Sequence, residues 1–324
     1  MKKLICVMLT VLMTLGLFAG CSAPADDGVI RVAIVQQLDH SSLDEIRLAA
    51  QAKLDEIAAE KGLTIEYKHF NGQNDTSILS QIGTQVVADN YDVIIPIATL
   101  AAQYSVTAAE GTNIPIIYAA VSDPEGAGLT GLANVTGVSD ALNTPFILDM
   151  MLAAQPDVQT VGLLYSTSEV NSEAPIAEAK AYLESKGIEY LEKTGTTSGE
   201  IVEAAASLVG RVDAVFTPTD NVVMAAEASV AELLNESGIA HYTGADSFVQ
   251  SGAFTTCGVN YTELGTQAAD MAFDILMGGD IGEFQVMDGG IITVNTDTAE
   301  AIGVDYEVFN TMANTVNAVT TTVD

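Results

Sequence analysis

The stretch DAVFTPTDN, residues 213–221, decides the fold class of this 324-residue chain. Its apolar run stops at a polar turn and leads into an alanine-rich segment, a pattern that predicts a strand, a turn and a helix. Either Thr219 or Asp220 is expected to cap that helix, because a short oxygen-bearing side chain accepts hydrogen bonds from free first-turn N–H groups. The same pattern occurs about 120 residues earlier, in residues 92–103.

Strand-like and helix-like segments alternate on both sides of this stretch. Such repetition predicts parallel strands with helical crossovers, and residues 30–123 and 161–246 repeat the same order of elements. We therefore predict an α/β fold of two Rossmann-like lobes, each a parallel sheet flanked by helices, joined by a hinge. The first lobe is expected over residues 28–140 and about 262–288, and the second over 141–261 and about 289–316.

The first 27 residues predict a signal peptide followed by a lipid attachment site. A basic start precedes an apolar run that is too short for a membrane span, which predicts a signal peptide over residues 1–20. Cys21 follows small residues, as in a bacterial lipobox, although Phe18 stands where leucine is usual. We expect Cys21 to carry lipid and residues 21–27 to tether the protein at the extracytoplasmic face of the cell membrane. The alternative is an ordinary secretion signal with a chance cysteine.

The charge balance excludes one class of partner. The chain has a formal net charge of −32, and neither lysine nor arginine occurs after Arg211. Nucleic-acid binding needs basic residues to displace counterions, so a nucleic-acid partner is excluded. Hydrophobic residues make up 48% of the chain and charged residues only 17%, which favours folded domains over disorder. A disulfide is not predicted, because Cys257 has no partner once Cys6 leaves with the signal peptide and Cys21 carries lipid.

Polar residues collect where the predicted strands end. Ligands bind beyond the carboxyl ends of the strands in open parallel sheets, so we predict that these residues face one cleft. None of them is lysine or arginine. The candidate ligand-binding residues are Gln37, Ser42, Ala98, Thr99, Asp123, Glu169, Asn171, Ser172, Thr219, Asp220, Asn221 and Asp246.

This cleft is predicted to hold an amino acid. Without a basic side chain, a ligand carboxylate must be held by hydroxyls and by backbone N–H groups at helix starts, such as residues 99–101 and 171–172. A ligand ammonium needs a buried carboxylate, which Asp220, Asp246 or Glu169 can supply. The alternative for Asp220 and its neighbours is that they only cap a helix.

Other functional signals are weak. Residues 126–131 satisfy G-x-G-x-x-G but lead into a strand-like run, so they are interpreted as a loop and not as a dinucleotide site. His40, His69 and His241 lack metal-ligand spacing and are interpreted as surface or core residues. No nucleophile, base, metal or cofactor site is recognisable, which predicts that the protein is not an enzyme. Aromatic residues that can stack on a ligand, or else finish a core, are Tyr104, Tyr118, Tyr165 and Phe248.

Several motifs resemble, in order, those of one family. They lie at residues 97–103, 120–124, 134–140, 164–172 and 218–221. Together they resemble the substrate-binding lipoproteins of ABC transporters, a family that includes tryptophan- and tyrosine-binding components. The resemblance runs from about residue 30 to residue 304. One departure is that His40 is followed by Ser41, where family members often have a His-Pro pair after the first strand.

The resemblance implies a type I periplasmic-binding fold with a hinge and delivery of the ligand to a permease. It also implies ligand contacts from Ala98, Thr99, Glu169, Asn171, Ser172, Thr219, Asp220 and Asn221. We therefore predict a lipid-anchored binding protein that closes on a small amino acid, with aromatic ones favoured, and that passes it to ABC permease subunits. The alternative is a ligand sensor whose closed form signals to a membrane receptor or kinase.

Overall fold

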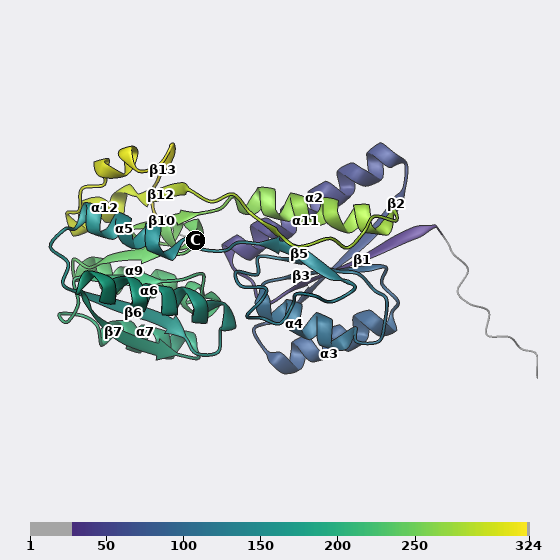
Figure 1. Cartoon of the computed structure of the whole chain (residues 1–324), viewed down its shortest axis with the longest axis horizontal. Coiled ribbons are helices and arrows are strands. Elements are labelled where there is room, and N and C mark those ends of the chain that lie inside the picture. Colours follow the sequence, from purple (N-terminus) through teal and green to yellow (C-terminus); the bar gives the residue numbers. More distant parts are fainter. Residues whose placement is uncertain (1–27, 323–324) are drawn as a thin grey trace, which may run out of the picture.

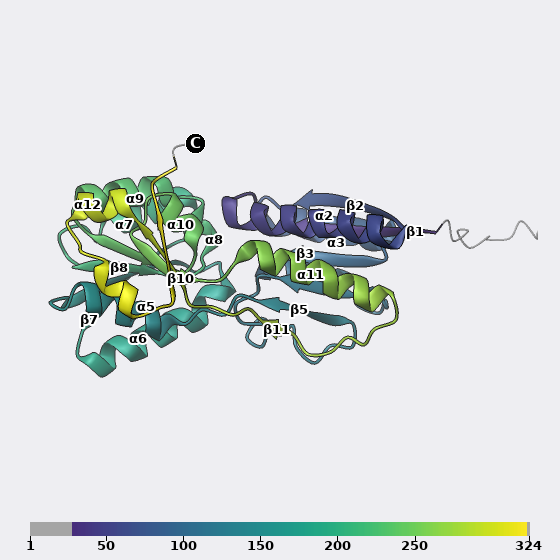
Figure 2. The ribbon, with the colours of Figure 1, turned by 90° about the horizontal axis from the view of Figure 1, so that it is seen from above.

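The computed structural model describes residues 28–322. The predicted signal peptide, lipid attachment at Cys21 and tether lie outside the described residues. Two lobes lie side by side along the long axis of the molecule, and each contains one β-sheet with helices on both faces (Figures 1 and 2). Within residues 28–322, no helix has the length and apolarity needed to cross a bilayer.

The strands of the first lobe are β1 (Val29–Gln36), β2 (Thr64–Asn71), β3 (Val93–Ile97), β4 (Ile116–Ala119), β5 (Val135–Ser139) and β11 (Gln285–Val286). They form a six-stranded sheet in the order β11-β5-β4-β3-β1-β2, with all neighbours parallel. Every residue of β3 is buried, as expected for a parallel sheet that is covered on both faces. The α/β prediction is therefore confirmed for this lobe.

Helix packing in the first lobe joins segments that are far apart in the sequence. Helix α2 (Ser41–Lys61) begins shortly after β1, and α11 (Tyr261–Leu276) comes from late in the chain and packs along it (Figure 2). The two helices approach closely at Gly265, where a Cβ atom would overlap the carbonyl oxygen of Ile46. The other helices of this lobe are α3 (Thr76–Ala88) and α4 (Thr99–Ala108).

The strands of the second lobe are β6 (Thr160–Ser166), β7 (Glu189–Gly195), β8 (Ala214–Thr217), β9 (Ala240–Thr243), β10 (Thr255–Gly258), β12 (Ile291–Asn295) and β13 (Thr315–Val319). They form a seven-stranded sheet in the order β13-β12-β10-β9-β8-β6-β7. The run β9-β8-β6-β7 repeats the run β4-β3-β1-β2 of the first lobe. Strands β10 and β12 pair antiparallel, and the other neighbours pair in parallel.

Helices flank both faces of the second sheet (Figure 2). The α-helices are α5 (Thr144–Ala154), α6 (Glu173–Lys186), α7 (Ser198–Ala206), α8 (Asn221–Met224), α9 (Glu227–Glu236), α10 (Asp246–Gln250) and α12 (Thr296–Ile302). Two 3₁₀ helices, η1 (Val170–Ser172) and η2 (Glu307–Thr311), complete the lobe.

The stretch 213–221 forms the expected strand and turn, but not one continuous helix. Asp220 caps α8 by accepting hydrogen bonds from the N–H groups of Val222 and Val223. The helix then stops after four residues and restarts as α9 at Glu227. At the break, the Glu227 carboxylate turns into the core and lies 3.0 Å from Nδ1 of His241. The break between α8 and α9 therefore coincides with a buried Glu227–His241 pair, which the sequence pattern does not reveal.

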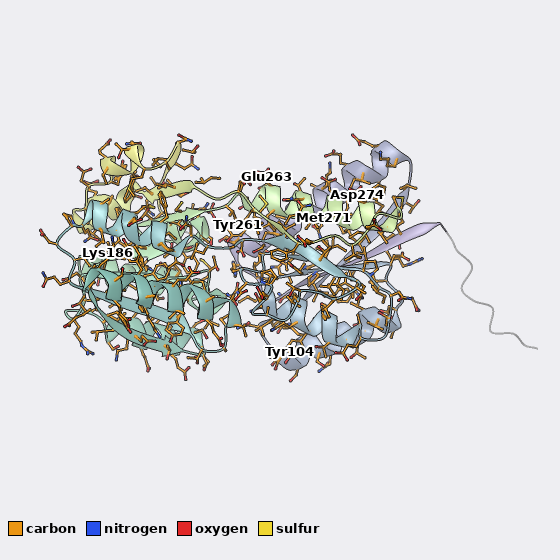
Figure 3. All side chains as sticks on the ribbon, in the orientation of Figure 1. Tyr104, Lys186, Tyr261, Glu263, Met271 and Asp274 are labelled. Carbon is orange, nitrogen blue, oxygen red and sulfur yellow. The ribbon has the colours of Figure 1, made fainter. Side chains whose placement is uncertain are left out.

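The chain passes between the lobes at residues 139–144, 258–261 and 286–291. Each passage links an element of one sheet to an element that packs in the other lobe. Tyr261, the first residue of α11, lies at the junction of the two lobes (Figure 3). These segments form the hinge region, and the ends of the central strands face each other beside it.

Candidate functional site

Residues that follow the central strands of both lobes line one cavity at their boundary. Ala98 and Thr99 follow β3 of the first lobe, whereas Thr219 and Asp220 follow β8 of the second lobe. The predicted site residues that line this inter-lobe cavity are Ser42, Ala98, Thr99, Asn171, Thr219, Asp220 and Asn221. Candidate residues from the two halves of the sequence are thus brought together.

Three predicted site residues do not line the cavity but form hydrogen bonds to elements around it: Gln37, Glu169 and Ser172. Nε2 of Gln37 donates to Oε1 of Glu169 across the lobe boundary at 2.8 Å. Oε1 of Gln37 accepts from the N–H of Leu100 in the first turn of α4 at 3.1 Å, which uses one of the free N–H groups of that helix. Ser172 donates to Oδ2 of Asp220 at 2.7 Å. These residues hold the strand ends in place rather than lining the cavity.

Asp123 and Asp246, which are both among the predicted ligand-binding residues, are not brought to this cavity. Oδ1 of Asp123 accepts from the N–H of Gly126 at 2.8 Å, so this carboxylate stabilises a turn. Asp246 lies at the start of α10 and lines a separate hollow together with Glu45. Burial raises the pKa of Asp246 to about 6, with a further contribution from the Glu45 charge. The two residues occupy equivalent places in the sequence but different surroundings in the fold.

Direct hydrogen bonds join the lobes around the cavity. Ser42 donates to Ser247 at 2.5 Å, Ser122 and Thr219 share a hydroxyl hydrogen bond of 3.0 Å, and Nε2 of His40 lies 3.0 Å from Oδ1 of Asn221. The cavity between these contacts has a volume of about 20 Å³. That space suffices for a water molecule, which needs roughly 10–15 Å³. An amino acid can enter only if the lobes separate.

The carboxylate of Asp220 is already surrounded by hydrogen-bond donors. Oδ1 accepts from the two N–H groups that it caps, each at 3.0 Å. Oδ2 accepts from the N–H of Ser166 at 2.6 Å and from the hydroxyl of Ser172. Asp220 thereby joins the end of β6, helix η1 and the start of α8. This role leaves it less free to hold a ligand ammonium than the sequence predicts.

The site carries acidic groups without basic partners. Glu169, Asp220 and Asp140 are each at least 95% buried, and among the described residues no lysine or arginine lines the cavity. Burial, and then the nearby charge of Asp220, raise the pKa of Glu169 to about 8. Burial also raises the pKa of Asp220 and of Asp140. A cation brought into this region would stabilise the ionised carboxylates.

Several residues of the site were missed by sequence reasoning. His40, interpreted as a surface or core residue, lines the cavity, as do Ser122, Asp140, Ser247 and Tyr261. A signal existed for Ser122, which directly precedes the candidate Asp123 at the end of a predicted strand. Tyr261 and Ser247 carry no such signal, because only the folded chain places α10 and α11 against the cleft.

Unpartnered polar atoms mark the cavity wall as a place for ligand contacts. Nδ1 of His40 and Oδ1 of Asn171 are buried and have no hydrogen-bond partner within residues 28–322. Ala98 adopts φ 75° and ψ 163°, and Ala120 has φ 55°. Backbone strain of this kind costs about 1–3 kcal/mol per residue and concentrates at binding and catalytic sites. Both alanines line the cavity.

Phe248 is the only one of the four proposed aromatic stacking residues that lines the cavity. Tyr104 and Tyr118 pack in the core of the first lobe, and Tyr165 packs against the core of the second. Over residues 28–322, no group of three or more histidine, cysteine, aspartate or glutamate side chains is arranged to hold a metal ion. The cavity is lined by hydroxyl, amide and acidic groups, by His40, and by apolar and aromatic side chains such as Met224 and Phe248.

Comparison with known proteins agrees with this arrangement. The sequence model of the family described as ABC transporter substrate binding protein matches residues 31–315. The chain belongs to this family. Members of the family are binding components of transporters and not enzymes, as the sequence predicts.

Named relatives are similar over most of the chain. The Tyrosine-binding protein of Clostridioides difficile is 33% identical over 278 residues, which cover 84% of this chain and 80% of the relative. A solved structure of an ABC domain from Streptococcus pneumoniae in complex with L-Trp is 29% identical, with a TM-score of 0.82, covering 89% of this chain and 99% of that one.

A ligand-free, open structure provides a contrast. It is that of a substrate-binding protein with adhesive properties from Clostridium difficile, which is 30% identical, with a TM-score of 0.68, over 90% of this chain and 100% of that one. The present chain therefore superposes better on the L-Trp complex than on the open structure, although the identities are nearly equal. The difference agrees with the direct hydrogen bonds between the lobes, which indicate a closed arrangement.

Proposed function

We propose that this substrate-binding protein captures a small amino acid between its lobes, with aromatic amino acids favoured, and delivers it to an ABC permease. We also propose that lipid on Cys21 holds the protein at the extracytoplasmic side of the cell membrane. The tyrosine-binding relative and the L-Trp complex support the choice of an aromatic amino acid. The leader-like sequence before residue 28 supports the anchor.

The charge of the site is the observation that carries the proposal. Asp220 lines the inter-lobe cavity, and buried Glu169 is hydrogen-bonded to Asn221, which also lines it. Within residues 28–322, no lysine or arginine lines this cavity. A positively charged ligand group compensates such carboxylates, and burial makes the attraction stronger than in water. Glu169 is the better partner for an ammonium, because amide groups of Gln37 and Asn221 hold it while Asp220 is held by four donors.

The start of α4 supplies the complementary charge. Ala98, which precedes this ten-residue helix, and Thr99, its first residue, both line the cavity. A helix N-terminus carries free N–H groups and a partial positive charge, which suit a carboxylate. Opening of the lobes breaks the bond between Gln37 and Glu169, which crosses the lobe boundary. A zwitterion with its carboxylate toward Thr99 and its ammonium toward Glu169 therefore matches the opened site without any basic side chain. Phe248 and Tyr261 provide aromatic surface beside it.

Binding must include hinge motion. The closed cavity of about 20 Å³ does not admit an amino acid, so the lobes open at the hinge region and then close around the ligand. In the liganded form, ligand contacts take the place of some direct bonds between the lobes. Because the binding protein closes around its ligand, the shape that it presents to the permease differs between the liganded and the ligand-free protein.

Thermal denaturation of the protein from residue 28 onward, with each of the twenty amino acids, tests this proposal. A ligand that binds only the native form raises the melting temperature. We expect tyrosine, tryptophan or phenylalanine to raise it most, with sugars as negative controls. If sugars raise the melting temperature and no amino acid does, the amino-acid assignment is wrong.

A further inference from the structure

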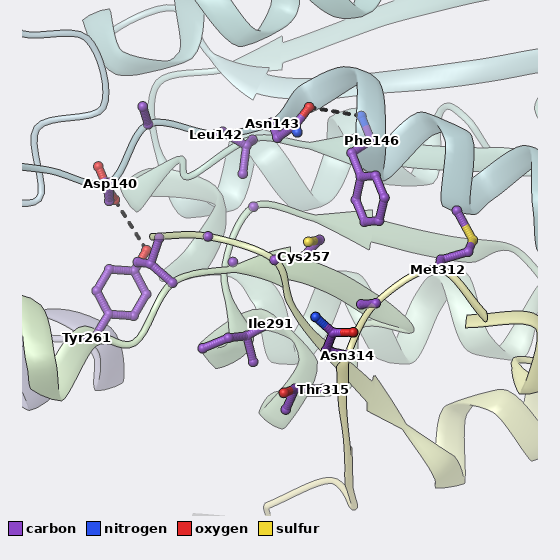
Figure 4. A pocket seen from close by; sticks show the side chains of 17 residues that line it. Asp140, Leu142, Asn143, Phe146, Cys257, Tyr261, Ile291, Met312, Asn314 and Thr315 are labelled. Carbon is purple, nitrogen blue, oxygen red and sulfur yellow. Dashed lines mark hydrogen bonds between the residues drawn. The ribbon is translucent and has the colours of Figure 1, made fainter. Parts of the chain in front are cut away.

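A second and larger cavity lies at the hinge region, outside the inter-lobe site (Figure 4). Its volume is about 590 Å³, within the roughly 300–1,000 Å³ of sites for small molecules. Its walls come from every passage between the lobes and from the segment before β13. Each of the three passages contributes lining residues, among them Leu142, Gly258 and Gly290. Ala313, from the segment before β13, also lines the cavity.

The chemistry of this hinge cavity is divided between two sides. Asp140 and Tyr261 lie on one side, while Phe146 and Met312 lie on the other, with Cys257 between them (Figure 4). In the part of the chain that the structure describes, no lysine or arginine lines the cavity. The walls therefore offer one carboxylate, the amides of Asn143 and Asn314, and apolar side chains on the side opposite Asp140.

Asp140 and Tyr261 line the hinge cavity and the inter-lobe cavity at once. The Tyr261 hydroxyl donates to Oδ2 of Asp140 at 3.3 Å, and Ser122 donates to Oδ1 at 2.9 Å. Ser122 in turn shares a hydrogen bond with Thr219 of the second lobe. A continuous set of contacts thus leads from the hinge cavity to a bond that joins the closed lobes.

We propose that the hinge cavity is a second binding site, for a small organic monocation with an apolar body, and that its occupation shifts the opening and closing of the lobes. Each oxygen of the Asp140 carboxylate accepts one hydrogen bond and retains capacity for another. Phe146, Met312 and Ile291 receive the apolar body. This proposal does not depend on which solute binds between the lobes.

A molecule bound in the hinge cavity should affect closure of the lobes, because the cavity walls belong to different lobes. Asp140 and Tyr261 move with the first lobe or the hinge, whereas Phe146 and Met312 belong to elements packed in the second lobe. A molecule that touches both sides fits one hinge angle better than others. Such differential affinity is what shifts a conformational equilibrium.

A set of three matched probes tests the site. Cyclohexylmethylammonium, cyclohexylmethanol and cyclohexylacetate share one ring and differ in charge, and calorimetry measures their binding to the protein from residue 28 onward. We expect the ammonium to bind, the alcohol to bind at least tenfold more weakly and the carboxylate to show no binding. Absence of ammonium binding, or preference for the carboxylate, overturns the proposal.

Two tryptophan substitutions locate the probe in this tryptophan-free chain. Ala313→Trp fills the hinge cavity and is expected to weaken ammonium binding at least tenfold. Thr99→Trp fills the inter-lobe cavity and leaves the walls of the hinge cavity unchanged, so it acts on ammonium binding only through closure and is expected to weaken it less than Ala313→Trp does. The reverse pattern would place the probe between the lobes and overturn the proposal. Thermal melting of both variants verifies that they fold.

Asp140→Asn provides a test that does not fill the cavity. This variant keeps the shape of the side chain, and we expect it to abolish the preference for the ammonium over the alcohol. Small-angle scattering then measures closure, with a radius of gyration that changes on saturation with the ammonium in the unsubstituted protein and not in Ala313→Trp. A retained preference, or an unchanged radius in the unsubstituted protein, contradicts the proposal.

Discussion

Asp220 serves the fold at the place where a ligand contact was predicted. The sequence predicts its capping role, because the residue type and its position before a helix suffice for that inference. Its bonds to Ser166 and Ser172 could not be predicted, since these residues lie 54 and 48 positions away and meet it only after the sheet has formed. The same carboxylate therefore has a local role that the sequence reveals and a long-range role that it does not.

Asp220→Ala is expected to reduce the free energy of unfolding by about 3 kcal/mol. Loss of a cap costs roughly 0.5–2 kcal/mol, and buried donors left without a partner add roughly 1–3 kcal/mol. Urea denaturation measures the change. Asp75→Ala is the matched control, because Asp75 caps α3 at an exposed position. It should cost about 1 kcal/mol. Equal losses in the two variants would contradict the long-range role of Asp220.

Glu169 is expected to make stability fall as the pH rises. Burial raises its pKa from the ordinary value of 4.5 to about 8, so between these values the folded protein binds more protons than the unfolded chain. The contribution of Glu169 to stability is therefore greatest below about pH 4.5 and decreases up to about pH 8. Melting temperatures from pH 5 to pH 8 should decline less steeply in Glu169→Gln. An unchanged slope would show that Glu169 is not the titrating group.

At the scale of elements, the packing of the first lobe depends on the close approach of helices α2 and α11. Helix α11 can lie along α2 only because Gly265 has no side chain at the contact with the carbonyl oxygen of Ile46. This contact joins two segments that are more than 200 residues apart in the sequence. The stability of the first lobe therefore depends on Gly265, which lies in the last quarter of the sequence.

Gly265→Ala is expected to destabilise the protein by roughly 1–3 kcal/mol, as overpacking does in a tight core. Gly199→Ala in α7 is the matched control, since no atom lies within 4 Å of its new Cβ. That substitution should not destabilise the protein, because the new methyl group meets no neighbouring atom and alanine is a better helix former than glycine. Chemical denaturation of both variants measures the difference. Stabilisation by Gly265→Ala would mean that the two helices can move apart without cost.

The order of strands and helices was largely predictable from the sequence. Apolar runs such as β3 and β8 end at polar turns, and the repeated order of elements indicates parallel sheets in two lobes. The break between α8 and α9 was not predictable, because it accompanies the contact of Glu227 with His241 on another strand. Cavity residues of α10 and α11 were missed for the same reason, since tertiary packing alone brings them to the site.

At the scale of the whole molecule, the lobes are joined by hydrogen bonds between side chains that also line the site. Ser122 and Thr219, which are 97 residues apart, meet across the boundary at 3.0 Å. Bonds of this kind must break before an amino acid can enter. The opening equilibrium and the affinity for the solute are therefore linked.

A disulfide between the lobes is expected to prevent solute binding. Ser122→Cys combined with Thr219→Cys places two thiols where the hydroxyl oxygens are 3.0 Å apart. Oxidation should lock the closed lobes and abolish binding in calorimetry, and reduction should restore it. Each single variant serves as a control, since Cys257 is buried and has a pKa raised to about 11. Full binding by the oxidised protein would show that the solute enters without lobe opening.

The late origin of α11 and β11 has a consequence for biogenesis. β11 is the edge strand of the first sheet and ends at Val286, and α11 covers part of that sheet. The lobe that begins the chain is therefore incomplete until most of the polypeptide has been made. No contiguous fragment of this sequence corresponds to either lobe, so the two halves must mature together rather than one after the other.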